Sequence, residues 1–404
     1  MKVGLERLPG SRALSRLRAA RVGLLTHPAA VDGALRHVSD VLFALGVSPT
    51  LLFGPEHGYG GEAQDMVGVA DARDARFGAP IVSLYGDDLA SLSPTSAQLS
   101  ELDLLLIDLA DVGARYYTFV WTALLAVRAA ARAGKHVVLL DRPNPLGSRR
   151  EDVEGRTPSQ RRFLSFVGLE PVPVRHGFTI GEIVALFAAE EGLPLGPEGA
   201  LSILTVEGWD RAETAGAWDR PFVLPSPNMP TEATALVYPG GCLLEGTNLS
   251  EGRGLTRPFE IVGAPFVDGQ ALAADLAKSG LPGFVARPVT FHAMFHKHAK
   301  TISGGVQIHV TDRRAFRPLA TYLALIGMIA RRHPEAFRYR TERYEFIDDI
   351  PALDLLLGED DTRRALLGGE DPVAVARSAA AVDLEAYDAQ KNAAERALAH
   401  AAAI

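Results

Sequence analysis

The segment Leu102–Leu140 reads LDLLLIDLADVGARYYTFVWTALLAVRAAARAGKHVVLL, and its pattern decides the fold class. Its first eight residues form a nearly unbroken apolar run, as expected for a parallel strand covered by helices on both faces. Phe119–Gly134 has the apolar spacing and the glycine stop of a helix, and Lys135–Leu140 forms the next apolar run. Strand, helix and strand at these spacings predict a βαβ unit.

Similar signals lie on both sides of this unit. Downstream, Thr179 and Glu182 have the spacing of a capping box, which predicts a helix from about Ile180 to Glu190. Upstream, apolar runs predict three strands and helical spacing predicts one helix: strands at Ala20–Thr26, Thr50–Phe53 and Pro80–Tyr85, and the helix at Val38–Leu45. The expected fold class is therefore α/β, with a mostly parallel sheet and helices on both of its faces.

A second domain is predicted from the change of character near Asp268. Helices are expected at Gly269–Lys278 and Arg317–Arg332, and strands at Gly283–Val289 and Gly305–Val310. We expect a larger domain over residues 1–265 and a smaller α+β domain over 266–404 that helps to wall a cleft. Because Leu224–Phe259 is rich in proline and glycine, we expect it to follow a fixed, irregular path without a long helix.

Composition bounds the class of protein. The chain has 404 residues, 47% hydrophobic and 22% charged, as in an ordinary globular protein of two or more domains. A net charge of -8 argues against nucleic acid as a partner. Cys242 is the single cysteine, so an internal disulfide and a cysteine-based zinc site are excluded. No run suggests a membrane span, and the charge-interrupted N-terminus does not look like a secretory signal, so we expect a cytoplasmic protein.

Polar loops follow the predicted strands. Residues Leu51–Gln64 read LLFGPEHGYGGEAQ, so Glu56 and His57 come directly after an apolar run. Asp108, Asp111 and Arg115 follow the central strand in the same way. Because ligands bind at the carboxyl ends of strands in open α/β sheets, we expect these loops to share one crevice, where a carboxylate beside an imidazole can do acid/base chemistry. The alternative is structural: Glu56 and His57 are only polar loop residues, and Asp108 pairs with Arg115 or caps the next helix.

The segment Leu224–Phe259 carries side chains suited to binding the hydroxyls, amide and acid of a sugar. These side chains are Asn228, Glu245, Asn248, Ser250, Glu251 and Arg253. His176 lies just ahead of the predicted helix at Ile180, where a structural hydrogen bond is the main alternative to a catalytic role. No P-loop, GxGxxG after the first strand or GxSxG elbow is present, and no cofactor is expected.

Three further histidines, His292, His296 and His298, include a pair at the i, i+4 spacing of a metal site. No acid lies within this cluster, and Pro288 before it and Gly304 after it indicate a loop. We therefore expect a solvated loop and no metal.

Taken in order, these segments make the sequence resemble the exo-β-N-acetylmuramidase family, exo-acting glycoside hydrolases that remove N-acetylmuramic acid (MurNAc) from the non-reducing end of peptidoglycan fragments. The matching stretches are VGLLTHPAAV, GPEHGYGGEAQ, DLADVGARYYTF, LDRPNPLG, PVPVRHGFTIGE, PSPNMPTEATALVYPGGCLLEGTNLSEGRGLTRPFE and GVQIHVTD. The resemblance implies a Rossmann-like catalytic domain without a nucleotide, followed by a smaller domain. It also implies that Glu56 is the central catalytic carboxylate. The substrate contacts that it implies are His57, Arg115, Tyr116, His176, Asn228, Asn248, Glu251 and Arg253.

Glycosidic cleavage needs an acid for the leaving oxygen and a second group at the anomeric carbon. We assign the acid role to Glu56. Candidates for the second group are Glu251, Glu245, Asp111 and the substrate's own acetamido group; of the carboxylates, Glu251 and Asp111 are our catalytic candidates, and Glu245 is also a candidate substrate contact. The loop Gly58–Glu62 lacks the arginine often expected there in relatives, so we assign the lactyl carboxylate of the sugar to Arg115 or Arg253.

Two alternatives to this assignment stay open. One is a non-catalytic protein that binds muropeptides, and the other is a hydrolase of another amino-sugar glycoside. For the favoured assignment, the expected substrate is a muropeptide-derived disaccharide recycled inside the cell.

Overall fold

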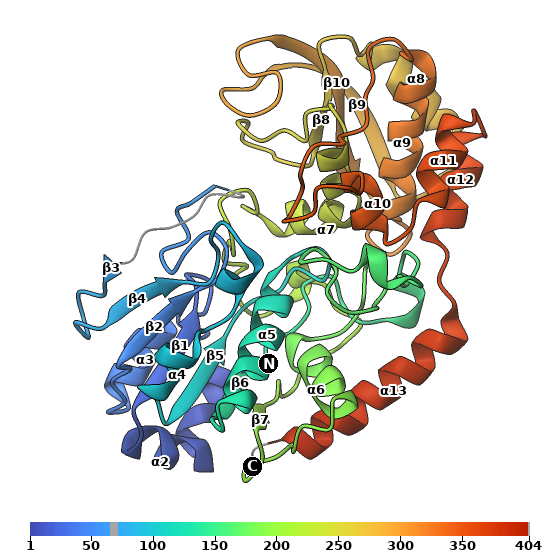
Figure 1. Cartoon of the computed structure of the whole chain (residues 1–404). Helices are drawn as coiled ribbons and strands as arrows, with labels where there is room; N and C mark the ends of the chain where they lie inside the picture. Colours follow the sequence, from blue (N-terminus) through green and yellow to red (C-terminus); the bar gives the residue numbers. More distant parts are fainter. Residues whose placement is uncertain (65–71, 403–404) are drawn as a thin grey trace.

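The computed structural model of the chain describes residues 1–64 and 72–402, and its two β-sheets lie one above the other in Figure 1. The larger sheet has seven strands in the order β3-β4-β2-β1-β5-β6-β7. Its strands are β1 (Val22–Thr26), β2 (Leu51–Gly54), β3 (Ala72–Arg73), β4 (Pro80–Ser83), β5 (Leu104–Asp108), β6 (His136–Leu140) and β7 (Leu201–Leu204). All neighbouring pairs are parallel except β3 with β4. The predicted α/β class with a mostly parallel sheet is confirmed.

Apolar side chains alternate between the two faces of this sheet. On β5, Leu105 and Ile107 belong to the core that includes α5 and α6, whereas Leu104 and Leu106 pack with α1, α2 and α3. The helices of this unit are α1 (Gly4–Arg7), α2 (Arg12–Ala19), α3 (Val38–Ala44), α4 (Ser96–Ser100), α5 (Phe119–Arg132) and α6 (Ile180–Glu190). Burial on both faces explains why these strands read as continuous apolar runs.

Strands are added first on one side of β1 and then, from β5, on the other side, so the switch point of the strand order lies between β1 and β5, as in a Rossmann-like sheet. Loops that leave the carboxyl ends of these strands carry the polar segments found in the sequence. The loop after β2 runs on toward residues 65–71, which lie outside the described residues, so only its part up to Gln64 is discussed.

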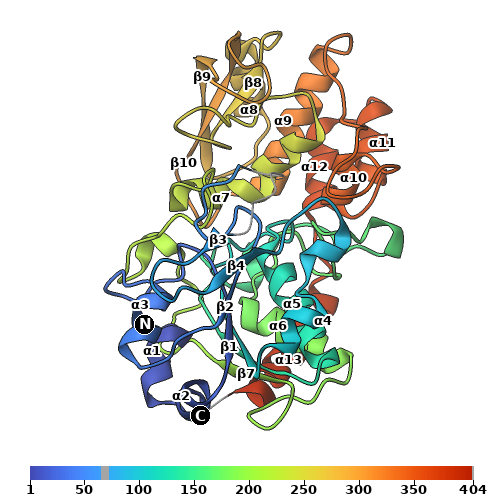
Figure 2. The same ribbon diagram turned by 60° about the vertical axis from the view of Figure 1, so that its left-hand side comes forward.

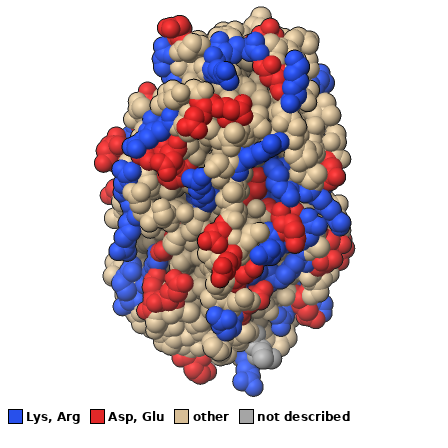
Figure 3. Space-filling view, turned by 90° about the vertical axis from the view of Figure 1, so that its right-hand side faces the viewer, with Lys and Arg blue, Asp and Glu red and all other residues tan. Residues whose placement is uncertain are grey.

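The smaller sheet is antiparallel, in the order β8-β10-β9, with β8 (Ile261–Ala264), β9 (Phe284–His292) and β10 (Ile302–Val310). Its helices are α8 (Gly269–Lys278), α9 (Pro318–Arg332), α10 (Ala352–Leu357), α11 (Asp361–Leu367) and α12 (Pro372–Ala380). On the face that carries α11 and α12, Figure 3 shows acidic and basic residues interspersed. Because β8 belongs to this sheet, the smaller unit takes in chain that precedes residue 266, where we had predicted its start.

The last helix, α13 (Leu384–Ala401), leaves the smaller unit and returns to the larger one. It packs along α6, and both views in Figures 1 and 2 show it beside the large sheet. Lys391 on α13 donates to Glu182 on α6 at 2.7 Å, which ties the two helices together. None of the helices in the described part of the chain has the length and apolar character of a membrane span.

The segment Leu224–Phe259 differs in part from the expectation of an irregular path. A ten-residue helix, α7 (Glu232–Gly241), forms within it, with Thr231 as its N-cap and Pro239 in its last turn. A Cβ on Gly240 would clash with the carbonyl oxygen of Pro318, so α7 approaches the start of α9 very closely. Tertiary packing therefore stabilises a helix where proline and glycine argued against one.

Candidate active site

A pocket lies between the loops of the large sheet and the segment that follows α7. Its wall includes three carboxylates and one guanidinium, together with a group of aromatic rings. The residues that line it are Glu56, His57, Tyr116, Tyr117, Thr118, Phe119, Val167, Ser226, Asn228, Met229, Tyr238, Cys242, Glu245, Arg253, Phe259, Tyr344 and Glu345. The structure thus brings together six of the residues predicted from the sequence: Glu56, His57, Tyr116, Asn228, Glu245 and Arg253.

Glu56 follows the end of β2 and is 7% exposed. A Cβ on Gly54 would clash with the backbone nitrogen of Tyr59, so glycine is required for the loop to fold back over the strand end. The hydroxyl of Thr118 donates to Oε2 of Glu56 at 2.8 Å. Because Thr118 immediately precedes α5, this bond fixes the carboxyl group against the rigid part of the larger unit.

His57 adopts a left-handed backbone conformation, with φ of 71°, at the turn of the same loop. Its Nδ1 lies 2.9 Å from the carbonyl oxygen of Ala63, which can only accept, so Nδ1 carries the proton. In the neutral ring Nε2 is then an acceptor. The ring also meets Phe119 edge-on, with 6.4 Å between centroids.

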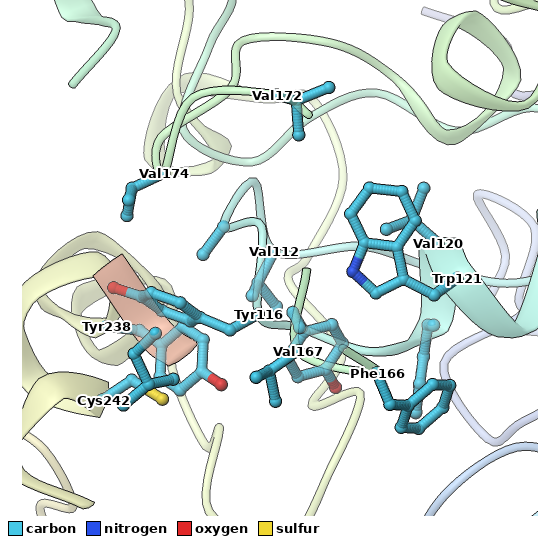
Figure 4. Close-up of a cluster of buried hydrophobic side chains, with 14 of the residues drawn as sticks. Val112, Tyr116, Val120, Trp121, Phe166, Val167, Val172, Val174, Tyr238 and Cys242 are labelled. Atoms are coloured by element: carbon cyan, nitrogen blue, oxygen red, sulfur yellow. The ribbon is translucent and has the colours of Figure 1, made fainter. Parts of the chain in front are cut away.

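Aromatic side chains form the floor of the pocket. The rings of Tyr116 and Tyr238 meet edge-on at 5.7 Å, and Figure 4 shows them beside Cys242. The hydroxyl of Tyr116 donates to the carbonyl oxygen of Pro239 in α7. Burial raises the pKa of the Cys242 thiol well above its ordinary value, so this thiol stays protonated.

Arg253 is the single Lys or Arg among the described residues that line the pocket. Its Nη2 donates to Oε1 of Glu245 at 2.9 Å, and its Nη1 donates to Oε1 of Glu251 at 3.0 Å. The other oxygen of Glu245 accepts from the hydroxyl of Tyr344 at 2.7 Å. The guanidinium is therefore held in place by two carboxylates, one inside the pocket and one behind it.

Glu251 is fully buried and does not line the pocket. Burial alone would raise its pKa, but Lys297 at 2.9 Å, His296 at 2.8 Å and Arg253 hold the pKa of Glu251 well below its usual range. The carboxylate is thus ionised and enclosed by Lys297, Arg253 and the imidazole of His296. It positions Arg253 from behind the pocket wall, away from the space where a substrate would lie.

Arg115 also lies away from the pocket. It is buried, and its guanidinium donates to the carbonyl oxygens of Arg156, Val172 and Leu356, each at 2.8 Å. Burial lowers the pKa of Arg115 to about 10. The alternative pairing of Arg115 with Asp108 is wrong, because Asp108 forms a buried ion pair with Arg142, with 2.9 Å between Oδ2 and Nη2.

Asp111 faces a second pocket, at the crossover between β1 and β5, and not the pocket of Glu56. Its Oδ2 accepts from the backbone of Gly113 at 2.8 Å and lies 3.2 Å from Nε2 of His176. His176 is completely buried, and its Nδ1 accepts from the backbone of Phe178 at 3.1 Å. The expected single crevice is therefore two separate pockets, and Asp111 and His176 form part of the loop framework between strands.

Asn248 links the segment after α7 to the C-terminal part of the chain. Its Nδ2 donates to the carbonyl oxygen of Ala336 and its Oδ1 accepts from the backbone of Arg338, both at 2.9 Å. With both ends of its amide bound to backbone, Asn248 does not reach the pocket. Asn228 does line the pocket, and its Nδ2 donates to Gln64 at 2.9 Å.

The loop between β9 and β10 is largely exposed, as expected, but two of its histidines contact the rest of the chain. Nδ1 of His296 lies 2.8 Å from Glu251, and Nε2 of His298 lies 2.6 Å from the carbonyl oxygen of Asn248. Both histidines therefore anchor the loop to the segment that carries Arg253. Within residues 1–64 and 72–402, no group of three His, Cys, Asp or Glu side chains is placed to hold a metal ion.

Several lining residues were missed from the sequence. Tyr117 and Thr118 stand next to the predicted Tyr116, and Ser226 lies in the same proline-rich segment as Asn228, so proximity in sequence could have found them. Tyr344 and Glu345 come from a segment with no turn or motif signal that would connect it with Glu56.

His27, at the end of β1, is also part of the framework. Its Nε2 accepts from the backbone of Ala110 at 2.9 Å, and its Nδ1 lies 3.3 Å from the carbonyl oxygen of Pro225. Burial, with a contribution from Arg142, lowers the pKa of His27 to about 3. The ring is therefore neutral and joins the loops on either side of the pocket wall.

Comparison with known proteins identifies the family of the chain that carries this pocket. The N-terminal family model of exo-beta-N-acetylmuramidase NamZ matches residues 22–233, and the C-terminal model matches residues 236–394. The peptidoglycan beta-N-acetylmuramidase NamZ of Bacillus subtilis (strain 168) is 41% identical over 324 residues, which cover 80% of this chain and 76% of that protein.

Two crystal structures of DUF1343 family proteins from Bacteroides fragilis share the fold. One is 27% identical with a TM-score of 0.84 and covers 98% of this chain and 97% of its own. The other is 23% identical with a TM-score of 0.70 and covers 97% and 98%. The two family models, which match most of the chain in order, and the 41% identity to the Bacillus subtilis protein establish that the chain belongs to the exo-beta-N-acetylmuramidase NamZ family.

Proposed function

We propose that this protein is an exo-acting glycoside hydrolase that releases MurNAc from the non-reducing end of peptidoglycan fragments such as MurNAc-GlcNAc. Membership of the family and the similarity to the Bacillus subtilis enzyme support this activity. The observation that carries it within the structure is the position of Glu56, a buried carboxyl group that lines the pocket. Such a group suits proton donation to a leaving oxygen.

Glu56 acts as the general acid in this proposal. Its proton passes to the glycosidic oxygen as the bond from that oxygen to the anomeric carbon breaks. The hydroxyl of Thr118 holds the carboxyl group in one orientation, which reduces the conformational freedom lost on reaching the transition state. His57, next in the chain, presents an acceptor nitrogen to a sugar hydroxyl.

Arg253 recognises the lactyl carboxylate that distinguishes MurNAc from GlcNAc. Its Nη1 and Nη2 donate to Glu251 and Glu245, and these two bonds fix the orientation of a planar guanidinium that suits a carboxylate. Glu251, which is itself bound by Lys297, holds the guanidinium from behind, so the position of Arg253 does not depend on the substrate. Asn228, Tyr116 and Glu245 supply further polar contacts from the same pocket.

A product assay tests the function directly. The purified protein is incubated with MurNAc-GlcNAc, and free MurNAc is measured by chromatography, in parallel with a GlcNAc-GlcNAc disaccharide. We expect release from the first substrate and little from the second. Binding of MurNAc-GlcNAc without any release would favour a non-catalytic muropeptide-binding protein, and equal release from both would favour a hydrolase of a broader class of amino sugars.

The cellular setting that we propose is the recycling of muropeptide-derived disaccharides in the cytoplasm. The single cysteine is compatible with this setting, because Cys242 is a buried free thiol and the chain needs no disulfide. Fractionation of cells followed by the MurNAc-release assay tests the location.

A further inference from the structure

Three carboxylates are present among the described residues that line the pocket: Glu56, Glu245 and Glu345. Glu245 has both oxygens bound, one to Arg253 at 2.9 Å and the other to the hydroxyl of Tyr344 at 2.7 Å. Its charge is thus matched by a guanidinium and its orientation is fixed by the protein. Glu245 is poorly suited to act on a water or a sugar carbon.

The two sequence-derived candidates for a second catalytic group lie outside this space. Glu251 is enclosed by Arg253, Lys297 and His296, and Asp111 lines the other pocket. Among the described residues that line the pocket, Glu345 is the carboxylate that remains after Glu56 and Glu245 are assigned. It is 7% exposed, and the hydroxyl of Tyr85 donates to its Oε2 at 3.2 Å.

The backbone at Glu345 adopts a conformation that is unfavourable for its residue type, which points to a functional role for the side chain. Glu345 and Phe346 are the two central residues of a tight turn in which the backbones of Tyr344 and Ile347 exchange hydrogen bonds of 2.9 and 3.0 Å. Their φ angles are 43° and 71°, both left-handed, as in a type I′ turn. Such turns strongly favour Asn-Gly, and a Glu-Phe pair stores strain of the kind that is concentrated at functional sites.

Both neighbours of Glu345 fix the turn to the walls of the pocket. The ring of Phe346 packs edge-on against Tyr85 at 5.7 Å and against Phe166 at 6.2 Å. On the other side, Tyr344 is bonded to Glu245. Tyr85 follows β4, the sheet neighbour of the strand that leads to Glu56. The turn therefore brings a carboxylate from the C-terminal part of the chain against the loops of the large sheet.

We propose that Glu345 is the second carboxylate of the glycosidase reaction. It takes a proton from the water whose oxygen bonds to the anomeric carbon, while Glu56 gives its proton to the leaving oxygen. One C–O bond forms and one breaks, and the proton that Glu56 loses is replaced through solvent by the one that Glu345 gains. This assignment deepens the proposed function and rests on it.

Two substitutions test the role of Glu345. In Glu345→Asn the new residue tolerates the left-handed conformation, so the melting temperature should equal or exceed that of the wild type, while kcat on MurNAc-GlcNAc falls at least about 100-fold. Glu345→Gly also suits the turn and leaves room for azide, a nucleophile with no proton to remove. Azide should raise the turnover of this variant and yield N-acetylmuramyl azide, but should not raise that of Glu56→Gln.

The matched control is Glu342→Asn, an exposed acid of the same segment, which should keep wild-type turnover. Turnover of Glu345→Asn within about threefold of the wild type would overturn the proposal, as would a lost activity in Glu345→Gly that azide does not restore. A raised KM with unchanged kcat would do so too, because it would assign Glu345 to substrate binding. If the wild type itself releases no MurNAc, the proposed function fails before this test begins.

Discussion

At the scale of single residues, the same side-chain type has different roles according to what surrounds it. Glu56 faces the pocket and accepts from a hydroxyl, whereas Glu251 is fully buried against Lys297, Arg253 and His296 and is held in the ionised state. The sequence places both in polar, glycine-containing loops and cannot distinguish them. Their partners Thr118 and Lys297 are distant along the chain, so only the folded structure separates the acid from the support.

Replacement of the proposed acid is the first prediction. Glu56→Gln should reduce turnover on MurNAc-GlcNAc by on the order of 100-fold or more, since the amide cannot donate the required proton. Because an amide oxygen still accepts from Thr118, the melting temperature should stay close to that of the wild type. The control is Glu62→Gln, an exposed acid of the same loop that does not line the pocket. Near-normal turnover in Glu56→Gln would remove this residue from the mechanism.

A second prediction concerns Glu154, which is buried where the larger unit meets the start of α9. Burial raises the pKa of Glu154 from 4.5 to about 7. Between these values the folded chain binds more protons than the unfolded chain, so this group's contribution to stability is complete below about pH 4.5 and is lost as the pH rises through 7. The full change amounts to about 3 kcal/mol.

Glu154→Gln should therefore flatten the dependence of the free energy of unfolding on pH between 4.5 and 7. Urea denaturation at a series of pH values measures this free energy, and Glu151→Gln, an exposed neighbour, serves as the control. The same slope in Glu154→Gln and the wild type would show that Glu154 is ionised in the folded chain throughout this range.

At the scale of elements, local signals predict the fold well and the site only in part. Apolar runs predict strands β1, β2, β4, β5 and β6, and the capping box of Thr179 and Glu182 is observed at the start of α6. The proline and glycine content around α7 argues against a helix there, yet a helix forms. The close packing of Gly240 on the start of α9 outweighs the free-energy cost of Pro239 within the helix. The turn at Glu345 has neither glycine nor asparagine, so no turn signal points to it.

The cap of α6 provides a prediction at this scale. The hydroxyl of Thr179 accepts from the backbone of Glu182 at 3.1 Å and donates to buried Asp141 at 2.9 Å. Thr179→Ala removes both bonds and should lower the free energy of unfolding by about 1 to 2 kcal/mol. Thr179→Ser should recover most of the loss. Denaturant titration measures both variants, and an unchanged midpoint in Thr179→Ala would contradict the structural importance of the cap.

At the scale of the whole molecule, the pocket depends on both units of the chain. Glu56 and Thr118 come from the larger unit, and Glu345 comes from the segment that follows α9. The helix α13 then returns from the smaller unit to pack on α6. The two sheets are thus joined by a shared site and by a chain that crosses between them twice.

This arrangement predicts that the two units unfold together. Differential scanning calorimetry should give one transition whose calorimetric and van't Hoff enthalpies agree. Lys391→Met, which removes the bond from α13 to Glu182, should lower the melting temperature of that single transition. Two separate transitions in the wild type would show that the smaller unit is stable by itself and that α13 does not couple it to the larger one.

The buried thiol of Cys242 makes the chain suitable for fluorescent labelling. Its pKa is far above neutral and its sulfur is enclosed by the pocket wall, so maleimide dyes at pH 7 will not react with it. A cysteine introduced at exposed Met294, on the loop beside Arg253, will be the one reactive thiol of the folded protein. The emission of a dye attached there will then report on sugar entering the pocket without interference from a second label.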